Sequence, residues 1–311
     1  MIRTKEFYPE GWLLNTPENR AATATPTALA DAAAAGTVLE ANVILCDAAH
    51  NLIVDLGCMK GLILREEGAV GIAEGTVRDI ALISRVGKPV CFTVTAIKTN
   101  AQGRLYAELS RRAAQLRCLE QLHREKPVGS VLNARVTHLE SFGAFCDVGC
   151  GIAALLPIDA ISVSRISHPR DRLRVGQDLR VVVRAVDENG RITLTQKELL
   201  GTWAENAACF SPGETVVGIV RSVEEYGVFI EIAPNLAGLA ESCGDLTPGQ
   251  AVSVYIKNIL PDKMKIKLVV VNRELNRTLR FEPRYFITKG RLERWVYSTP
   301  QCRKHIETHF G

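Results

Sequence analysis

The sequence predicts an all-β protein of three tandem five-stranded barrels connected by short linker helices. Short runs rich in Val, Ile and Thr alternate with polar residues at period two, which is the periodicity of strands. Gly, Pro and Asn separate these runs, as expected for turns. The pattern recurs three times along the 311 residues, in segments of about 60–75 residues that each suit one small barrel.

The second and third copies are the most alike. "VGSVLNARVTHLESFGAF" (128–145) aligns with "PGETVVGIVRSVEEYGVF" (212–229) at one constant offset. The identical or similar pairs are Gly129 with Gly213, Phe142 with Tyr226, Gly143 with Gly227, and Phe145 with Phe229. The later parts, 175–197 and 248–270, resemble each other within one residue of slippage. A weaker first copy is visible at 36–57 and 86–110.

These copies predict the domain order. We expect an N-terminal arm at 1–35, a first, degenerate barrel at 36–110, a helical linker at 111–126, a second barrel at 127–197, a linker at 198–210, a third barrel at 211–272, and a basic C-terminal extension at 273–311.

The connecting segments carry local signals of their own. The Ala- and Thr-rich stretch 19–35 suggests a flexible front half and a short helix that stops at Gly36. Ser110 is a suitable N-cap for the next helix. The expected apolar stripe of that helix is Leu116, Leu119 and Leu122. We expect Trp203 to pack on a barrel, and two strand-like runs within 282–299 to form a hairpin.

Composition and charge favour a protein without disulfides or membrane spans. Nine cysteines are scattered irregularly without a CxxC pair, which argues against a disulfide framework. The N-terminus is too polar for a secretory signal, and no apolar run is long enough to span a bilayer. We therefore expect a cytoplasmic protein. Residues 104–126 and 273–311 are net basic, which suits a polyanionic partner, although solvated linkers are the commoner cause of such runs.

The run "LESFGAFCDVG" (139–149) stands out because only 6% of the residues are aromatic. In a straight strand, Phe142 and Phe145 point to opposite faces because they are three residues apart. A bulge at Gly143 brings both rings to one exposed face. The alternative is that one Phe of the pair packs in the core. Tyr226 and Phe229 repeat the pattern in the third copy.

An exposed aromatic pair on a small barrel suits single-stranded nucleic acid, because every base can stack on a ring. Nearby cations then hold the phosphates. The candidates in the second copy are His138, Arg191 and the loop 164–174 with His168. For that loop, a merely solvated charged surface is at least as good an explanation.

The second copy also resembles a known family. "GSVLNARVTHLESFGAFCDVG", "ALLPID" and "VGQDLRVVVRAVDENGRITLTQK" are similar to the S1 RNA-binding domain, the repeat of bacterial ribosomal protein S1. The resemblance is strong over 127–197, good over 211–271 and weak over 36–110. It implies the five-stranded barrel called the OB-fold.

The resemblance also implies a set of RNA-binding residues. In the second copy these are Phe142, Phe145, Asp187 and Arg191, with Pro157 where the family has a His. In the third copy they are Tyr226, Phe229 and Lys265, with Glu241 in the His position and Pro261 in the Asp position. An acid facing phosphate predicts weaker binding by the third copy.

The first copy lacks the aromatic pair. His50 and Ile53 stand at the two ring positions, although Arg104 is kept. We therefore expect the first barrel to pack against a neighbour or to dock a protein.

We expect no enzyme activity, no cofactor and no metal. The chain has no P-loop, no dinucleotide-binding glycine motif and no nucleophile elbow. Cys302, His305 and His309 have a spacing that suits metal ligands, but no second Cys pair precedes them at finger-like distance.

The expected function is binding of single-stranded RNA, and the resemblance implies mRNA near the small ribosomal subunit. Two alternatives remain open. One is a free regulatory RNA-binding protein that is not part of the ribosome, and the other is a protein-interaction scaffold.

Overall fold

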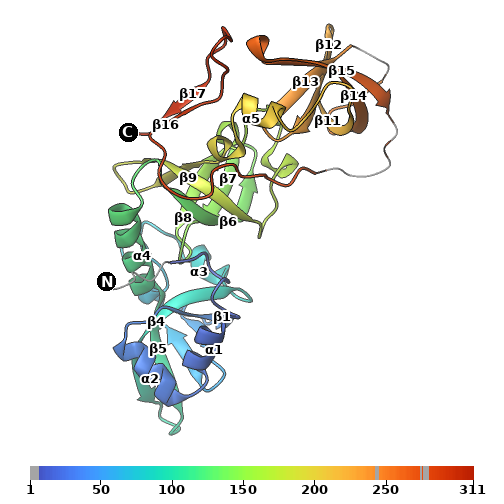
Figure 1. The fold of residues 1–311 in the computed structure, drawn as a ribbon. Helices are drawn as coiled ribbons and strands as arrows, with labels where there is room; N and C mark the ends of the chain where they lie inside the picture. Colours follow the sequence, from blue (N-terminus) through green and yellow to red (C-terminus); the bar gives the residue numbers. More distant parts are fainter. Residues whose placement is uncertain (1–6, 242–244, 274, 276–279) are drawn as a thin grey trace. The chain divides into compact units, whose positions relative to one another are not determined.

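A computed structural model describes residues 7–241, 245–273, 275 and 280–311. It contains three closed five-stranded barrels, so the predicted all-β class and the three barrels are confirmed (Figure 1). The chain divides into two compact units. Unit 1 comprises Met1–Glu125 and Asp147–Ala153, and unit 2 comprises Lys126–Cys146 and Ala154–Gly311.

The strands of the barrels follow the three sequence copies. The first barrel consists of β1 (Leu39–Cys46), β2 (Leu52–Asp55), β3 (Lys60–Ile63), β4 (Pro89–Thr99) and β5 (Leu105–Ser110). The second consists of β6 (Val131–Glu140), β7 (Gly143–Asp147), β8 (Ala153–Pro157), β9 (Asp178–Val186) and β10 (Ile192–Thr195). The third consists of β11 (Thr215–Glu224), β12 (Gly227–Ala233), β13 (Leu236–Ala240), β14 (Ala251–Leu260) and β15 (Lys265–Asn272).

All three barrels share one topology. The first three strands form an antiparallel meander, and the fifth strand inserts between the third and the fourth. The third strand pairs with the fifth in parallel, as β3 with β5, β8 with β10, and β13 with β15. Closure leaves no unpaired sheet edge, and the inward side of each strand is filled by buried aliphatic residues.

Two helices precede the first strand, and the others lie between strands. They are α1 (Pro17–Thr23), α2 (Pro26–Ala34), α3 (Ile80–Ile83), α4 (Arg111–Glu125) and α5 (Trp203–Ala207). Single 3-10 turns are η1 (Arg65–Glu67), η2 (Ile158–Ala160), η3 (Pro169–Asp171), η4 (Lys197–Leu200) and η5 (Pro261–Lys263).

The N-terminal segment is more ordered than the sequence predicts. Helix α1 occupies the front half of the stretch expected to be flexible, and Thr16 caps it by accepting the N–H of Asn19. The buried Asn19 side chain then accepts the N–H of Glu40 and donates to the Glu40 carbonyl. The expectation of a flexible front half was wrong because these bonds tie α1 to β1, far along the chain.

Helix α4 begins where predicted, and the Ser110 hydroxyl accepts the N–H of Ala113. Its buried face differs from the prediction. The buried residues are Arg111, Ala114, Gln115, Cys118 and Leu122, whereas Leu116 is exposed. Leu122 of the predicted stripe is buried and Leu116 is not, because the buried face also takes in Arg111 and Gln115, whose polar partners no pattern of apolar residues can indicate.

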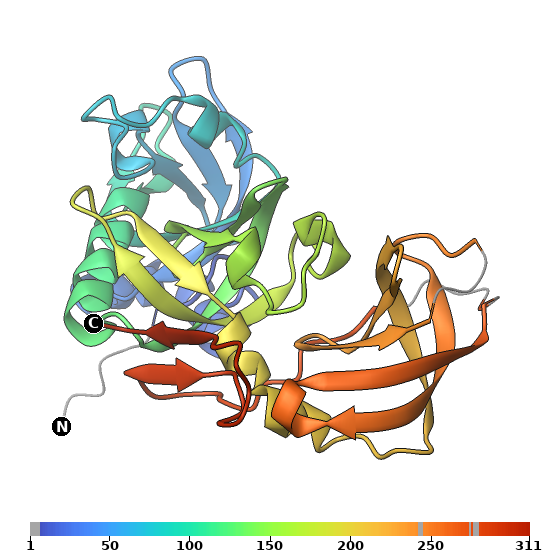
Figure 2. The same cartoon turned by 90° about the horizontal axis from the view of Figure 1, so that it is seen from above.

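The C-terminal extension contains a pair of antiparallel strands, but its second strand is not the predicted one. β16 (Arg294–Val296) pairs with β17 (Glu307–His309), not with the run expected within 282–299 (Figure 2). The preceding chain instead bonds to the start of the second barrel. The N–H of Val131 donates to the Gly290 carbonyl, and the N–H of Leu292 donates to the Gly129 carbonyl.

Within unit 2, buried polar groups join the second and third barrels. Asn235 is fully buried; its side chain accepts the N–H of Val163 and donates to the carbonyls of Lys197 and Gly201. Trp203 lies in the same hydrophobic cluster as the third-barrel core, as expected for a residue that packs on a barrel.

A buried carboxylate in unit 1 ties the N-terminal segment to the first barrel. Glu10 forms a two-bond ion pair with Arg111, at 2.7 Å and 3.0 Å, and accepts the N–H of Cys91. Both side chains are almost inaccessible to solvent. The Arg111 guanidinium and the backbone bond hold the pKa of Glu10 below its ordinary value despite burial, so this is an ion pair in the interior.

Candidate nucleic-acid interface

The two phenylalanines of the second barrel form an exposed pair. Phe142 lies in the turn between β6 and β7 and is 53% exposed. Phe145 lies on β7 and is partly exposed. Their ring centroids are 6.1 Å apart at an interplanar angle of 89°, a T-shaped contact. Neither ring is buried in the barrel core, so the core-packing alternative does not apply to this pair.

Gly143 acts differently from the prediction. A straight strand through both rings was the wrong premise, because Phe142 precedes β7 and lies in the turn. A Cβ atom at Gly143 would lie 2.5 Å from the Leu156 carbonyl oxygen. The glycine therefore permits close approach of β7 to β8. The turn, and not a bulge at this glycine, brings the rings together.

The third barrel repeats this arrangement. Tyr226 lies in the β11–β12 turn, is 70% exposed, and meets Phe229 at 6.1 Å and 87°. A Cβ at Gly227 would lie 2.5 Å from the Ala240 carbonyl oxygen, on the neighbouring strand β13. The same backbone approach thus positions the same aromatic pair twice.

Strand pairing defines the surface around the third-barrel rings. Phe229 pairs with Ser222 on β11 and with Leu239 on β13. Leu239 pairs with Lys267 on β15, and Lys267 pairs with Asn258 on β14. Paired residues share one face of a sheet, so the exposed Lys267 lies on the aromatic face. Sequence reasoning missed Lys267; the alternation of β15, with Lys265 and Lys267 both exposed, was the available signal.

The polar candidates of the second barrel are dispersed along its edges. His138 is exposed on β6 and pairs with Glu140 at 2.7 Å. The repeat aligns His138 with Ser222, the partner of Phe229. Arg191 is exposed in the β9–β10 turn. One oxygen of Asp187 accepts the N–H groups of Asn189 and Arg191, so this carboxylate shapes the turn whether or not it meets a ligand.

Two residues of the loop 164–174 have structural roles. His168 caps η3, where its Nδ1 accepts the N–H of Arg170. Arg172 is buried and donates to the Glu231 carboxylate, which also accepts from Arg221 at 2.7 Å. Burial lowers the pKa of Arg172, but Glu231 opposes this effect. Arg172 is therefore neither a solvated charge nor available to a ligand, whereas Arg165, Arg170 and Arg174 of the same loop are exposed.

The first barrel presents a different surface at the same positions. Ile53 pairs with Leu45 after a register shift, as Phe229 pairs with Ser222. Ile53 also pairs with Leu62, and Leu62 with Glu108. An aliphatic side chain thus replaces the second ring, His50 stands at the position of the first, and an acid stands where the third barrel has Lys267.

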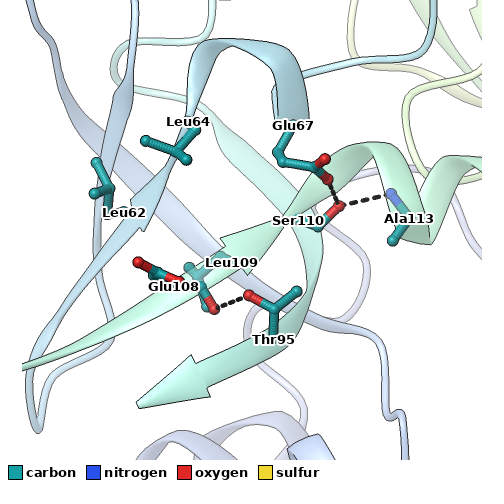
Figure 3. Close-up of a pocket in the computed structure, with 8 residues that line it drawn as sticks. All are labelled: Leu62, Leu64, Glu67, Thr95, Glu108, Leu109, Ser110 and Ala113. Carbon is teal, nitrogen blue, oxygen red and sulfur yellow. Dashed lines mark hydrogen bonds between the residues drawn. The ribbon is translucent and has the colours of Figure 1, made fainter. Parts of the chain in front are cut away.

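A pocket of about 290 Å³ opens beside this row (Figure 3). Its walls are mainly apolar, and it also contains two carboxylates. It is lined by Leu62, Leu64, Glu67, Thr95, Glu108, Leu109, Ser110 and Ala113. The Ser110 hydroxyl donates to Glu67, and Glu108 pairs with Lys98 at 2.8 Å. Tyr106 lies beside Glu108 on this surface, but the described residues show no aromatic pair like those of the other two barrels.

The described residues contain no cluster of three or more His, Cys, Asp or Glu side chains suited to a metal ion. His305 and His309, two of the residues with ligand-like spacing, each pair with Glu307. Across that same part of the chain, we find no helix with the length and apolar character needed to cross a bilayer.

Comparison with known families and proteins gives consistent matches. The profile of the S1 RNA binding domain matches residues 125–197. The small ribosomal subunit protein bS1 homolog of Bacillus subtilis is 34% identical over 172 residues, covering 51% of this chain and 44% of that protein. Small ribosomal subunit protein bS1 of Leuconostoc lactis is 31% identical over 250 residues, covering 76% of this chain and 56% of that protein. The chain therefore spans about half the length of these relatives.

Among solved structures, a multidomain protein with nucleic acid binding domains from Streptococcus pneumoniae is similar over 78% of this chain and 75% of that one. The sequence identity is 14% and the TM-score 0.27, a likeness too distant to support an argument about this chain.

Proposed function

We propose, from the premise that residues 125–197 are an S1 RNA-binding domain, that this protein binds single-stranded RNA on its second and third barrels. Bases stack on Phe142 and Phe145, and on Tyr226 and Phe229. Phosphates are held by exposed cations, of which Arg191 and Lys265 occupy the last hairpin of each barrel. His138 lies on the aromatic face of the second barrel by the repeat alignment.

One observation carries this proposal. Two barrels expose the same T-shaped aromatic pair at equivalent turns, each positioned by a glycine that lets two strands approach closely. Clustered exposed apolar side chains often mark an interaction site, and each base stacked on a ring gains about 1–3 kcal/mol. Two such pairs in one chain favour a ligand with repeated flat groups, which describes an unpaired RNA strand.

The biological ligand in this proposal is mRNA, and the site of action is the small ribosomal subunit in the cytoplasm. The support is the identity to proteins named small ribosomal subunit protein bS1. Cosedimentation of the protein with small subunits at moderate salt tests this part. A protein that binds RNA but stays at the top of the gradient is instead a free regulatory RNA-binding protein.

A binding titration tests the RNA proposal itself. Fluorescence anisotropy with a labelled oligouridylate is the direct measurement, repeated at several salt concentrations because phosphate contacts are salt-dependent. Micromolar or tighter binding that weakens with salt supports the proposal. Absence of binding at low salt contradicts it. A parallel incubation with Mg²⁺ or Zn²⁺ reveals any cleavage of the RNA, which a binding protein without catalysis does not produce.

The first barrel has a second candidate function, which is docking of a protein. Ile44 and Leu45 are about half exposed on β1, and Ile53 and Leu62 continue the aliphatic row toward the pocket of Figure 3. Leu45→Asp tests this candidate. It lowers recovery of protein partners in a pulldown and leaves the RNA affinity unchanged if the first barrel serves as a docking surface.

A further inference from the structure

The same β-bulge occurs between the fourth and fifth strands of all three barrels. In the third barrel, Ile256 pairs with Leu268 and Asn258 with Lys267, so Lys257 is the extra residue. In the second barrel, Leu194 pairs with Val183 and Thr193 with Ala185, so Arg184 is the extra residue. Bulges redirect a side chain and are frequent beside functional sites.

In the first barrel, the extra residue of the bulge is uncharged. Val94 pairs with Leu109 and Ala96 with Glu108, so Thr95 is the extra residue there. Its hydroxyl donates to the Glu108 carbonyl at 3.0 Å (Figure 3). The two barrels with exposed aromatic pairs therefore carry a cation at this position, and the barrel that lacks such a pair carries a neutral residue.

The bulge lies on the outer surface of the barrel, in a row of paired residues that leads to the rings. In the third barrel, Asn258 beside the bulge belongs to the paired row that runs through Lys267 and Leu239 to Phe229. Three strand spacings separate β12 from β14 along this row, about 14 Å at the usual spacing. An OB-type barrel binds about 4–16 nucleotides, so one strand of RNA covers both points.

In the second barrel, the side chain of Arg184 reaches η2, whose first residue bonds to the backbone of the aromatic turn. Its Nη1 atom lies 3.9 Å from an Asp159 carboxylate oxygen, and the guanidinium is substantially exposed. Ile158, directly before Asp159, donates its N–H to the Phe142 carbonyl at 2.9 Å. The long, exposed pair with Asp159 is weak, so Arg184 can exchange this partner for a phosphate.

We propose that the bulge cations Arg184 and Lys257 are phosphate-binding residues, which extend the RNA path from the aromatic pair across the face of each barrel. This inference rests on the proposed RNA binding. A bidentate guanidinium suits a phosphodiester better than an ammonium, so Arg184 contributes more than Lys257. The missing charge at Thr95 is then part of the reason why the first barrel does not bind RNA.

The test measures the salt dependence of RNA affinity for the full chain. The variants are Arg184→Ala, Lys257→Ala and the double variant, with a labelled oligouridylate as the probe. For single strands, each phosphate contact contributes about 0.7 to the slope of log affinity against log salt concentration. We expect each single variant to reduce the slope by about 0.7, and the double variant to reduce it by about 1.4.

Three controls make the result specific. Arg184→Lys keeps the charge and therefore most of the slope. Arg124→Ala removes an exposed arginine of α4, a helix that the proposed RNA path does not include, and leaves the slope unchanged. Phe142→Ala lowers the affinity by loss of stacking but keeps the slope.

The outcomes distinguish this inference from the proposed function. If the unmodified protein binds RNA and Arg184→Ala and Lys257→Ala keep its full slope, the bulge residues do not bind phosphate, although RNA binding stands. If Arg124→Ala reduces the slope equally, general electrostatic attraction explains the effect and the inference falls. If the unmodified protein does not bind RNA, both proposals fall.

Discussion

Removal of the Phe142 ring is the most direct perturbation of the proposed interface. The side chain is 53% exposed and touches Phe145 only edge-on, so Phe142→Ala should cost stability no more than one aromatic contact, about 0.5–1.5 kcal/mol. The loss of one stacked base should cost about 1–3 kcal/mol of binding free energy. The dissociation constant for RNA should therefore rise about 5- to 150-fold.

The assay is fluorescence anisotropy with a labelled oligouridylate at one fixed ionic strength, because affinity changes steeply with salt. Thermal unfolding of the variant establishes that the fold is intact. Tyr226→Ala should have a smaller effect, since Glu241 repels phosphate near the third-barrel site.

Tyr106 provides a control on the first barrel, because it is a partly exposed ring on β5 that the proposed RNA path does not use. Its hydroxyl donates to Glu108, an acid that disfavours a phosphate beside this ring. Equal losses for Tyr106→Ala and Phe142→Ala, or an unchanged affinity for Phe142→Ala, would refute stacking at this site.

Three further predictions concern stability. Glu10→Ala leaves the buried Arg111 without its counter-charge, so chemical denaturation should show a free energy of unfolding lower by about 3–5 kcal/mol. Lys98→Ala, at an exposed ion pair, should cost less than about 1 kcal/mol. Similar costs for the two variants would contradict the buried ion pair. Burial raises the pKa of Glu40 to about 7 from an ordinary value of 4.5, so the folded state binds this proton more tightly than the unfolded state. The free energy of unfolding should therefore fall by up to about 3 kcal/mol as the pH rises from 4.5 to 7. Glu40→Gln should remove that part of the pH dependence in denaturation curves at pH 5 and pH 8, and an unchanged pH dependence would show that Glu40 is not its source. Gly143→Ala places a Cβ against the backbone of β8 and should lower the free energy of unfolding by about 1–3 kcal/mol in melting experiments. The variant should also bind RNA less tightly. A fully stable variant would mean that β7 and β8 can separate there without penalty.

The aromatic pair shows what a local pattern can and cannot reveal. The sequence was sufficient to identify two rings flanking a glycine, twice, on strands with polar neighbours. It was not sufficient to explain the glycine, because the reason is the Leu156 carbonyl on the next strand. The distance between two strand backbones is a property of the closed barrel and has no periodic signature along the chain.

The C-terminal segment shows the same limit at longer range. Two adjacent strand-like runs suggested a local hairpin, but Gly290 and Leu292 bond to the start of the second barrel. The partner strand of β16 is Glu307–His309, which is too short to be recognised by alternation. A strand pairs with a distant segment when that segment supplies better hydrogen-bond partners than the nearest strand-like run in the sequence.

The sequence by itself determined the number and type of the barrels and the location of the rings. Both follow from short-range periodicity and from repetition, which the chain carries residue by residue. Only the tertiary structure decided which charged side chains are buried and which are exposed. Arg172 and Arg184 look alike in sequence, yet the first is buried against Glu231 and the second is exposed at a bulge. The difference is physical: a guanidinium is buried or free according to which distant strand supplies its counter-charge and which register its own strand adopts.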